Sequence, residues 1–468
     1  MAGAVFSVAG RPVVVMGAGR SGIAAALLLA ERGAHVTLTD LRPGLSDAHD
    51  VERLRDSGVE LELGGHRPET LMRTSLIVLS PGVPLSQPAL ATAQRAAVPI
   101  VGEIELASRW LRGRLIAITG TKGKSTTATL AGRMLDAGGI RTLVGGNIGV
   151  PLSAQVAAST SDTIHVVEVS SFQLETIQTF HPWIAVLLNF SPDHLDRHAS
   201  VEKYAGAKAR VFENQDERDW VVINADDPEA LALARAARGR RLQFSANASV
   251  QEGVVLLPGA VTYRHAGQDE PLVPLSAVKL IGRHLLADVA AAAAVAKLSG
   301  VSSADMTRAV ESFRGLEHAL EPVAEVRGVR FVNDSKATNV EAALRAIESF
   351  GEGLVVILGG RYKGGDFAQL QAPLASREAK VIAIGEARPL VREALEPAVP
   401  VTDAASMADA VGQAFERARP HGTVLLAPAC SSFDMFVDYA ERGRAFKQAV
   451  EELVNAEDAE GSRGRREQ

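Results

Sequence analysis

The stretch VVVMGAGRSG, residues 13–22, decides the fold class of this chain. Its apolar first half predicts a buried strand, and the three glycines that follow have the G-x-G-x-x-G spacing of a turn that leads into a helix. HVTLTD, residues 35–40, predicts a second strand after that helix. Because strand, turn and helix alternate in this way along much of the chain, we expect an α/β fold with parallel, doubly wound sheets.

The ligand of this first turn stays open at this point. Gly17, Gly19 and Gly22 would let the backbone approach a diphosphate at a helix N-terminus, and Asp40 ends a strand where NAD-binding domains carry an acidic residue. An NAD-dependent oxidoreductase is one interpretation, and a different diphosphate ligand is another. The same glycines also allow simple close packing of a helix against a strand.

Composition and charge limit the class of protein. The 468 residues suffice for about three domains, and 47% hydrophobic residues suffice for buried cores. A balance of 49 Lys and Arg against 55 Asp and Glu gives no electrostatic footprint for nucleic acid or an acidic membrane. Residues 285–298 are mostly apolar but include Asp288 and Lys297, so they predict a buried helix and not a membrane span. Cys430 is the single cysteine, which excludes an intramolecular disulfide. With no secretory signal pattern at the start, we expect a cytoplasmic protein without nucleic-acid or membrane partners.

A second glycine-rich loop lies in RLIAITGTKGKSTT, residues 114–127. An apolar strand leads into it and a helix follows, so that backbone N–H groups and the helix dipole would face an anion. Lys124 would supply a charge to the outer phosphates of a ligand, and Ser125 a hydroxyl to Mg²⁺. A tight turn without a ligand is the alternative, since the spacing is shorter than that of the common phosphate loop. We expect a phosphate-bearing ligand to be bound by the loop from Gly120 to Thr126.

Polar residues follow two neighbouring strands of the same unit. Glu168 ends the strand in TIHVVEV, and His194 follows the strand in WIAVLLNF. At the carboxyl ends of parallel strands, these groups would complete a Mg²⁺ shell, although oxygen ligands suit Mg²⁺ better than nitrogen. Alternatively, Glu168 caps a helix and His194 makes a hydrogen bond in a turn. By default Lys208 is a solvated helical lysine and Asn147 is a turn residue.

The last part of the chain repeats the strand, turn and helix pattern. VRFVNDS, GLVVILGG, KVIAIGE and TVLLAPA predict four strands, and the first leads into Asp334, Ser335, Lys336 and Thr338. A lysine at this position can hold a phosphate or a carboxylate, while Cys430 after the last strand is expected to pack in the core. We therefore expect a Rossmann-like domain at residues 1–110, a central P-loop ATPase-like domain at 111–317, a C-terminal Rossmann-like domain at 318–455 and a disordered tail at 456–468.

Taken together, the motifs resemble those of the Mur ligases, ATP-dependent enzymes that form amide bonds in peptidoglycan precursor synthesis. TGTKGKST, GGNIGVPL, EVSSFQLE, NFSPDHLDRH, YAGAKARVF, VNDSKATN, LGGRYKGGDF and LAPACSSFDMF occur in the family's order and span nearly the whole chain. SSFQLE and NDSKATN are most similar to the members that add D-glutamate to UDP-N-acetylmuramoyl-L-alanine. The resemblance implies this activity, with ATP and Mg²⁺ and with these two substrates as partners. We expect a monomer.

The resemblance also implies roles for single residues. ATP would be bound by Gly120, Thr121, Lys122, Gly123, Lys124, Ser125 and Thr126. Lys124, His194 and Lys208 would be catalytic, and Lys208 would be carbamylated by CO₂, which turns a cation into an anion that can lie beside Mg²⁺. Ser125, Glu168, His194 and Lys208 would hold the metal. Arg20, Ser21, Arg42, Ser80, Pro81, Gly82 and Asn147 would bind the UDP-linked substrate. Lys336, Thr338, Lys363, Ser432 and Tyr439 would bind the incoming glutamate.

Three positions depart from the family's pattern. Lys122 replaces a frequent Asn, and Leu285 and Asp288 replace both asparagines of a G-x-H-N-x-x-N motif, so Asp288 is left out of the predicted nucleotide site. A folylpolyglutamate synthase-like ligase is an alternative because it shares the ATP loop and glutamate transfer, but it does not need the N-terminal block. An NAD-dependent oxidoreductase and a non-catalytic nucleotide-binding regulator also stay open as interpretations.

Overall fold

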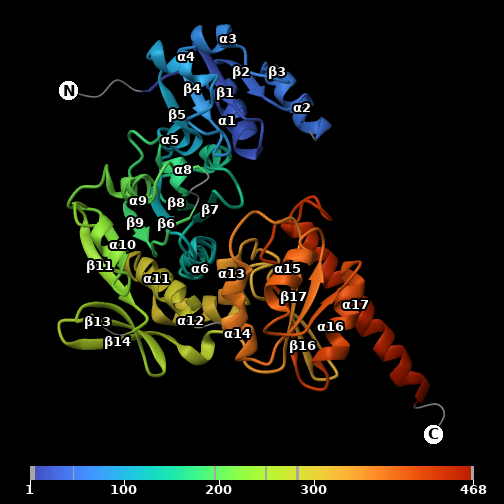
Figure 1. Ribbon diagram of the computed structural model, residues 1–468. Helices are drawn as coiled ribbons and strands as arrows, with labels where there is room; N and C mark the ends of the chain where they lie inside the picture. The colour runs from blue at the N-terminus through green and yellow to red at the C-terminus, as the bar shows by residue number, and fades with distance from the viewer. Residues whose placement is uncertain (1–5, 46, 194–196, 248–249, 281–283, 465–468) are drawn as a thin grey trace. The chain divides into compact units, whose positions relative to one another are not determined.

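The computed structural model of the chain describes residues 6–45, 47–193, 197–247, 250–280 and 284–464. The chain forms two compact units, Met1–Val278 with Leu286–Ser312 and Lys279–Leu285 with Phe313–Gln468. The first unit contains two β-sheets and the second contains one, and helices cover the sheets (Figure 1). The predicted α/β fold with parallel sheets is confirmed. The domain limits near residues 110 and 317 stay predictions.

The N-terminal sheet is parallel throughout, with the strand order β3-β2-β1-β4-β5. Its strands are β1 (Pro12–Met16), β2 (His35–Asp40), β3 (Glu60–Leu63), β4 (Leu76–Leu79) and β5 (Ile100–Gly102), and its helices are α1 (Arg20–Glu31), α2 (Ala48–Asp56), α3 (Pro68–Met72), α4 (Leu90–Arg95) and α5 (Glu103–Ser108). Leu29 and Leu106 pack on one face, and Leu71 and Leu90 on the other. The strand order reverses between β1 and β4, and ligands of such sheets bind at the carboxyl ends of the strands at this point.

The second sheet has nine strands in the order β14-β13-β12-β11-β10-β9-β6-β8-β7. The strands are β6 (Arg114–Thr119), β7 (Thr142–Gly146), β8 (Ile164–Glu168), β9 (Ile184–Leu187), β10 (Trp220–Asn224), β11 (Arg240–Ser245), β12 (Gly253–Leu257), β13 (Ala260–His265) and β14 (Gln268–Pro274). Strands β12, β13 and β14 pair in antiparallel fashion, and the remaining neighbours are parallel. The carboxyl ends of β6, β8 and β9 therefore meet at one edge of the sheet.

Helices connect and cover this sheet. They are α6 (Lys124–Ala137), α7 (Leu152–Gln155), α8 (Ser171–Leu174), α9 (Val201–Ala209), α10 (Pro228–Leu233), α11 (His284–Leu298) and α12 (Ser303–Ser312). Helix α11 is buried over most of its length, with Val289 through Ala296 having no exposed surface, as its alanine-rich sequence predicts. Within the described part of the chain, no helix combines the length and apolar character that crossing a membrane requires.

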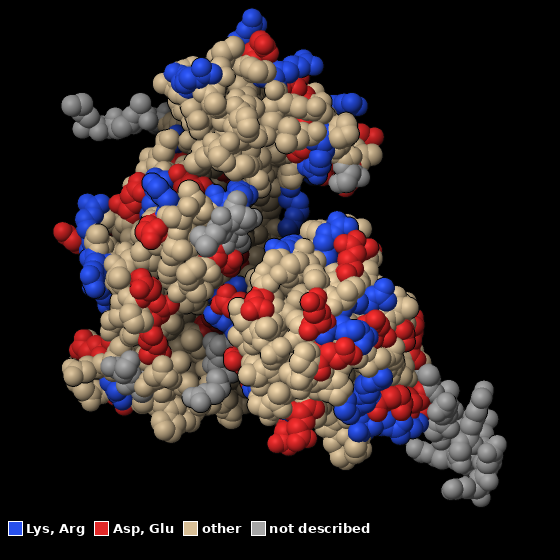
Figure 2. Space-filling view, in the orientation of Figure 1, with Lys and Arg blue, Asp and Glu red and all other residues tan. Residues whose placement is uncertain are grey.

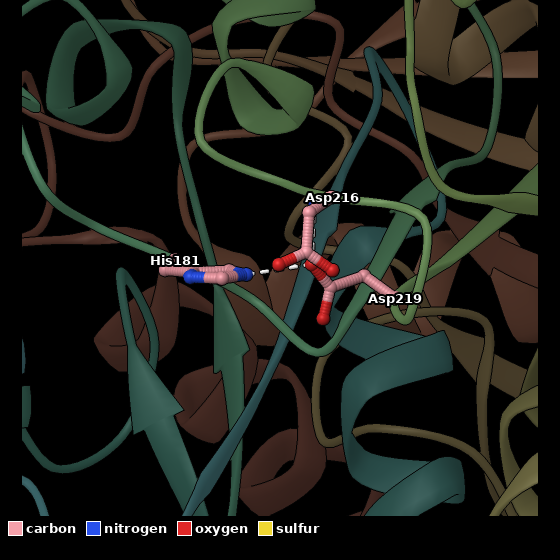
Figure 3. A group of neighbouring side chains, drawn as sticks. All are labelled: His181, Asp216 and Asp219. Atoms are coloured by element: carbon pink, nitrogen blue, oxygen red, sulfur yellow. Dashed lines mark hydrogen bonds and ion pairs between the residues drawn. The ribbon is translucent and has the colours of Figure 1, made fainter.

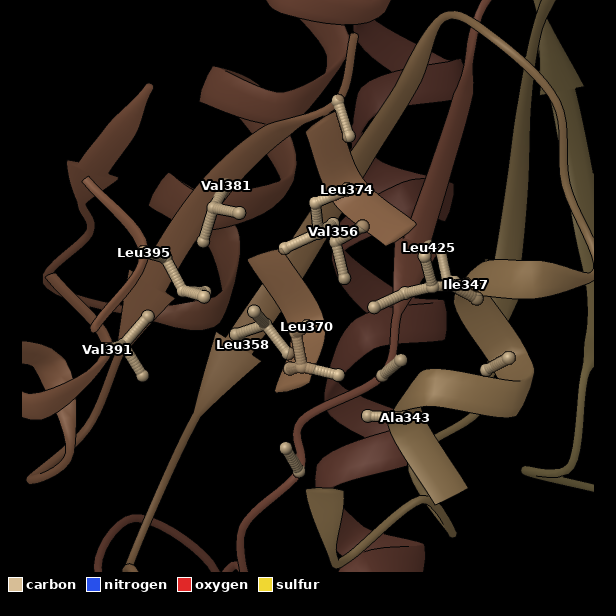
Figure 4. Packing of buried hydrophobic residues seen from close by; sticks show 14 of the residues in the cluster. Ala343, Ile347, Val356, Leu358, Leu370, Leu374, Val381, Val391, Leu395 and Leu425 are labelled. Atoms are coloured by element: carbon tan, nitrogen blue, oxygen red, sulfur yellow. The ribbon is translucent and has the colours of Figure 1, made fainter. Parts of the chain in front are cut away.

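The third sheet, in the second unit, has the order β15-β16-β20-β17-β18-β19. Its strands are β15 (Glu321–Val326), β16 (Val329–Asn333), β17 (Leu354–Gly359), β18 (Lys380–Ile384), β19 (Val401–Asp403) and β20 (Thr423–Leu426), and its helices are α13 (Val340–Glu348), α14 (Gln371–Ala375), α15 (Arg388–Leu395), α16 (Met407–Ala418) and α17 (Tyr439–Gly464). The four predicted strands are present as β16, β17, β18 and β20. Figure 4 shows the core on one face, where Ile347, Leu374 and Leu395 of three helices meet Val356 and Leu425 of the sheet. Burying each such side chain contributes about 1.5–3 kcal/mol.

The predicted disordered tail is wrong for residues 456–464, which continue helix α17 to Gly464. The segment contains alanine and glutamate, both strong helix formers, and it follows a helix that is already nucleated. Glu457 also forms an ion pair with Arg327, which follows β15. A tertiary contact therefore supports the helix beyond residue 455, where the C-terminal domain was predicted to end.

Charged side chains of both signs are intermixed on the visible surface of each unit (Figure 2). This distribution matches the near balance of acidic and basic residues in the sequence. Surface electrostatics of this kind favour solubility and do not by themselves indicate a binding partner.

Candidate functional site

The second glycine-rich loop joins β6 to α6 and has the geometry of an anion-binding turn. Gly120 has φ +153° and Gly123, the N-cap of α6, has φ +83°. A Cβ on Gly120 would lie 3.0 Å from the Cβ of Leu188, and one on Gly123 would lie 2.2 Å from Oδ1 of Asp288. The close packing and backbone angles both require glycine. The loop thereby directs the N-terminus of a helix of fourteen residues toward the space above the sheet.

Asn189, which follows β9, holds this loop in place. Its Oδ1 accepts the N–H groups of Thr121 at 3.0 Å and Lys122 at 2.9 Å, and its Nδ2 donates to the carbonyl of Lys122 at 3.1 Å. The hydroxyl of Thr121 lies 3.2 Å from that of Tyr204. Asn189 is not among the residues predicted from the sequence. The sequence could have indicated it, because Asn189 comes just after the buried strand β9. The carboxyl end of β9 lies at the same edge of the sheet as the glycine-rich loop after β6.

Two lysines converge on the loop's carbonyl groups. Nζ of Lys124 donates to Gly120 O at 3.0 Å and to Thr121 O at 2.9 Å, and Nζ of Lys208 donates to Gly120 O at 2.7 Å. Lys208 is 2% exposed, so the default interpretation of a solvated helical lysine is wrong. Burial, and then the charge of Lys124, lower the pKa of Lys208 well below its ordinary value. Its amine is therefore more often neutral than that of a surface lysine.

Glu168 connects the phosphate loop to β7 and β8. Its Oε2 accepts the hydroxyl of Ser125 at 2.6 Å, and its Oε1 accepts the amide of Asn147 at 2.8 Å. The alternative role as a helix cap is wrong, because Ser170 caps α8 and forms a capping box with Gln173. A buried carboxylate with a hydroxyl beside a phosphate loop is a donor set that suits Mg²⁺. His194, another of the four predicted metal ligands, lies outside the described residues.

The first glycine-rich turn borders a pocket of about 440 Å³ at the switch point between β1 and β4. The lining residues are Gly17, Gly19, Arg20, Ser21, Asp40, Arg42, Ser80, Pro81, Gly82, Val83 and Asn147. The structure thus brings together all seven residues predicted to bind the UDP-linked substrate. Arg20 and Ser21 begin helix α1, Arg42 follows β2, and Ser80, Pro81 and Gly82 follow β4. Asn147 follows β7 of the second sheet, within the same unit.

The glycines of this turn differ in what they do. A Cβ on Gly17 would lie 2.7 Å from Val83 Cγ2, and one on Gly22 would lie 1.8 Å from the carbonyl oxygen of Gly17. A Cβ on Gly19 would meet only Ser80 Oγ, at 3.9 Å. Gly17 and Gly22 therefore serve close packing, while Gly19 leaves open space toward the pocket.

The carboxylate of Asp40 is already occupied by hydrogen bonds from the first glycine-rich turn and from Arg42. It accepts the N–H of Ala18 at 2.6 Å, the N–H of Arg42 at 2.8 Å and the guanidinium of Arg42 at 3.0 Å. Burial raises the pKa of Asp40, but the hydrogen bonds from Arg42 and Ala18 outweigh it and lower the pKa to about 2. The carboxylate thus fixes Arg42 at the pocket and is not held ready for a ribose, which weakens the NAD interpretation.

The second unit carries the five residues predicted to bind glutamate. Lys336 and Thr338 lie in the loop after β16, Ser432 lies in the segment between β20 and α17, and Tyr439 is the first residue of α17. Ser335 joins the loop after β16 to the start of α17, because its hydroxyl donates to the carbonyl of Tyr439 at 2.7 Å. Lys363, the fifth predicted residue, is exposed, and its Nζ lies 5.5 Å from the centre of the Phe433 ring, in the same segment as Ser432. Cys430 is buried, as predicted, and burial raises the pKa of its thiol to about 12.

A further cluster, His181, Asp216 and Asp219, has side chains close enough to surround a cation (Figure 3). Its polar atoms already have partners: Asp219 Oδ2 accepts from His181 at 2.6 Å and from the N–H of Asp216 at 2.7 Å, and Arg218 binds the carboxylate of Asp216. His181 and Asp219 precede β9 and β10, at the opposite strand ends from the phosphate loop. These hydrogen bonds join the segments before β9 and β10, and the cluster is not part of the candidate site.

The sequence matches three family models in succession. They are described as Mur ligase MurD-like, N-terminal domain (residues 11–102), Mur ligase middle domain (118–296) and Mur ligase, glutamate ligase domain (320–430). Together they cover most of the chain.

Similar proteins extend over nearly the same length. A UDP-N-acetylmuramoylalanine–D-glutamate ligase of Acidobacterium capsulatum is 46% identical over 94% of this chain and 96% of its own, and the protein of that name from Koribacter versatilis is 42% identical over 97% and 100%. Among solved structures, the UDP-N-acetylmuramate-alanine ligase MurC of Thermotoga maritima aligns with a TM-score of 0.59 at 17% identity, covering 95% of this chain and 100% of that one. MurF ligase of the same organism in complex with ADP aligns with a TM-score of 0.59 at 16% identity, over 95% and 96%. These two likenesses concern the fold. From its matched domains and its relatives, the chain belongs to the Mur ligase family.

Proposed function

We propose that the chain is an ATP-dependent ligase that joins D-glutamate to the alanyl carboxylate of UDP-N-acetylmuramoyl-L-alanine, in peptidoglycan precursor synthesis. The observation that carries the proposal is the phosphate loop at residues 120–126, with Lys124, Lys208 and Glu168 gathered at it. Relatives named for this reaction are 41–46% identical over nearly the whole chain. Neither the folylpolyglutamate synthase-like ligase nor the NAD-dependent oxidoreductase is favoured by these relatives.

The first step activates a carboxylate, which by itself does not accept an amine. A carboxylate oxygen of the alanyl group forms a bond to the γ-phosphorus of ATP while the bond to the bridging oxygen breaks, giving an acyl phosphate and ADP. Lys124 lies at the N-terminus of α6 and would neutralise charge on the transferring group. Bound Mg²⁺ would supply further neutralisation of the phosphates, and Ser125 and Glu168 would hold it. His194 and a modified Lys208 complete the proposed ligand set.

Carbamylation of Lys208 fits its surroundings. The neutral amine attacks the carbon of CO₂, a C–N bond forms as one C=O π bond opens onto its oxygen, and the nitrogen releases a proton to water to give a carbamate anion. The lowered pKa of Lys208 makes the neutral amine available. The product would be an anion beside Lys124, whose positive charge would attract it.

The second step forms the amide. The amine nitrogen of D-glutamate attacks the acyl carbon, the bond from carbon to the phosphate oxygen breaks, inorganic phosphate leaves and the amine proton passes to water. The chain contributes mainly by positioning. The pocket with Arg20, Ser21 and Arg42 would hold the UDP group, and the loops with Lys336, Thr338, Lys363, Ser432 and Tyr439 would hold glutamate.

ADP release measured with all substrate combinations tests the proposal. We expect release only when ATP, UDP-N-acetylmuramoyl-L-alanine and D-glutamate are present together, and not when L-glutamate or L-lysine replaces D-glutamate. Adding hydroxylamine without D-glutamate should yield a hydroxamate of the UDP-linked substrate, because it traps an acyl phosphate. Release of ADP with no acceptor and no UDP-linked substrate would sink the assignment.

A further inference from the structure

Arg442, in the first turn of α17, is the largest fully buried side chain of the described residues, with 1% of its surface exposed. Its Nε donates to Ser335 Oγ at 3.0 Å, its Nη2 to the Ser335 carbonyl at 2.9 Å and its Nη1 to the Cys430 carbonyl at 3.1 Å. Within the described ranges, no carboxylate oxygen lies within the 4.0 Å of an ion pair from this guanidinium, and the charge of Asp434 acts on it only from a longer distance. All its strong partners are therefore neutral oxygens.

A buried cation without an ion-pair partner is costly to keep. Burial lowers the pKa of Arg442 to about 10, which still leaves it protonated at neutral pH. The backbone of Gly360 packs closely against the guanidinium. A Cβ on Gly360, at φ +131°, would lie 3.1 Å from Nη1 of Arg442 and 2.2 Å from the carbonyl oxygen of Ser431. An apolar side chain would fill the same space without the cost of burying a charge, so the charge and its hydrogen bonds need a reason.

The guanidinium joins the two segments that carry most of the proposed glutamate site. Ser335 directly precedes Lys336 in the loop after β16, and Cys430 lies two residues before Ser432 in the segment after β20. The hydroxyl of Ser335 accepts from Arg442 and donates to the carbonyl of Tyr439. One side chain of α17 thus connects the loop that holds Lys336 with the segment that holds Ser432, next to Tyr439 at the start of the same helix.

We infer that Arg442 is a positioning residue of the acceptor site, which fixes the Lys336 loop against the Ser432 segment and favours an acceptor with two carboxylates. The inference rests on the proposed function, which assigns these two segments to glutamate. Loops that are already fixed lose less conformational entropy when they bind a ligand, so affinity for the acceptor depends on them. The positive charge acts in a low-dielectric interior close to both segments, where its attraction for carboxylates is weakly screened.

Steady-state kinetics of full-length variants test this role. Arg442→Lys keeps the charge, but an ammonium cannot reach the Ser335 and Cys430 carbonyls together as the planar, forked guanidinium does. We expect KM for D-glutamate to rise about tenfold, the cost of one hydrogen bond to a charged group, while KM for ATP and for the UDP-linked substrate stays within about twofold. Arg442→Met, which also removes the charge, should raise KM for D-glutamate further.

Two more variants, Ser335→Ala and Arg444→Lys, sharpen the test. Ser335→Ala removes the hydroxyl between Arg442 and Tyr439 but leaves the guanidinium in place, so KM for D-glutamate should rise by a smaller factor even where Arg442→Met does not fold. Arg444, two residues along the same helix, is exposed and is the matched control, with all three KM values unchanged. An unchanged KM for D-glutamate in Arg442→Lys, or an equal rise of all three KM values, overturns the inference. A parent chain that releases no ADP in response to D-glutamate overturns the proposed function and this inference together.

Discussion

The ammonium of Lys208 donates to the carbonyl oxygen of Gly120 at 2.7 Å, across 88 positions of sequence. The contact places a buried amine directly under the phosphate loop, 4.7 Å from the centre of the Tyr204 ring. Helix α9 and the loop after β6 are thereby joined at one point. The proposed chemistry of this chain requires that this amine is carbamylated.

Replacing Lys208 by arginine should lower kcat for ADP release by about a hundredfold or more, because a guanidinium stays charged and cannot be carbamylated. Lys203, exposed on the same helix, is the matched control, and Lys203→Arg should leave kcat unchanged. The parent enzyme should also lose activity in CO₂-depleted buffer and regain it on addition of bicarbonate, as measured by ADP release. Full activity of Lys208→Arg would remove the carbamate from the mechanism.

Replacing Glu168 by glutamine should change the Mg²⁺ requirement. The amide of the Glu168→Gln variant still offers an oxygen to the Ser125 hydroxyl, so we expect the fold to be retained, but the negative charge is lost. The Mg²⁺ concentration for half-maximal ADP release should rise about tenfold, since divalent-cation affinity depends on the charge of the ligands. A Mg²⁺ titration at saturating ATP measures this shift, with the exposed Glu202→Gln as control. An unaltered Mg²⁺ titration would show that Glu168 does not hold the metal.

Alanine substitutions at Gly22 and Gly19 should distinguish the glycine needed for packing from the glycine that faces the ligand pocket. Gly22→Ala places a Cβ 1.8 Å from the Gly17 carbonyl, so we expect a loss of about 3 kcal/mol of stability and a clearly lower Tm. Gly19→Ala meets no such contact and should keep Tm, yet raise KM for the UDP-linked substrate because the added methyl group faces the pocket. Thermal unfolding and kinetics on both variants measure the difference. Equal Tm values would contradict the packing assignment.

Glu103 should make the stability of the first unit depend on pH. Its Oε1 accepts the N–H of Ser153 at 2.6 Å, while its buried Oε2 has no partner among the described residues. Burial, only partly offset by Ser153, raises the pKa of Glu103 from 4.5 to about 7. Between these values the folded state holds a proton that the unfolded state has released, so the contribution of Glu103 to stability falls as pH rises from 4.5 to 7.

Replacing Glu103 by glutamine removes this titration. Relative to the parent, the variant should gain about 3 kcal/mol in stability between about pH 4 and about pH 8, from a shift of about two and a half pKa units. Glu105→Gln is the contrast: Glu105 is equally buried but accepts hydrogen bonds from Arg109 and from Gln178, Thr179 and Phe180, so the change should destabilise the protein. Tm values at both pH values check the two variants. A parallel pH course of parent and Glu103→Gln would refute the raised pKa.

Much of the architecture could be predicted because its signals are local. The runs of apolar residues before Gly17 and Gly120 predict β1 and β6, and the turn residues after them predict where the helices begin. Strand ends also predicted where Glu168, Ser80 and Lys336 would lie, since parallel strands present their carboxyl ends at one edge. The edge strands β15 and β19 have weak patterns and were not predicted, and α17 continues past residue 455, where Glu457 forms an ion pair with Arg327.

By itself, the sequence determined the α/β class, the two glycine-rich loops and the residue types that face them, because spacing and periodicity act over a few neighbouring positions. Tertiary structure alone decided that Lys208 is buried, that Asn189 holds the loop after β6 and that Arg442 joins the loop after β16 to the segment after β20. Each of these depends on segments far apart in the chain, whose contacts set burial, pKa and hydrogen-bond partners. For VVVMGAGRSG, the sequence determined a turn whose backbone can approach a diphosphate. The structure decided that Gly17 and Gly22 are needed for close packing and that Gly19 leaves space at the pocket.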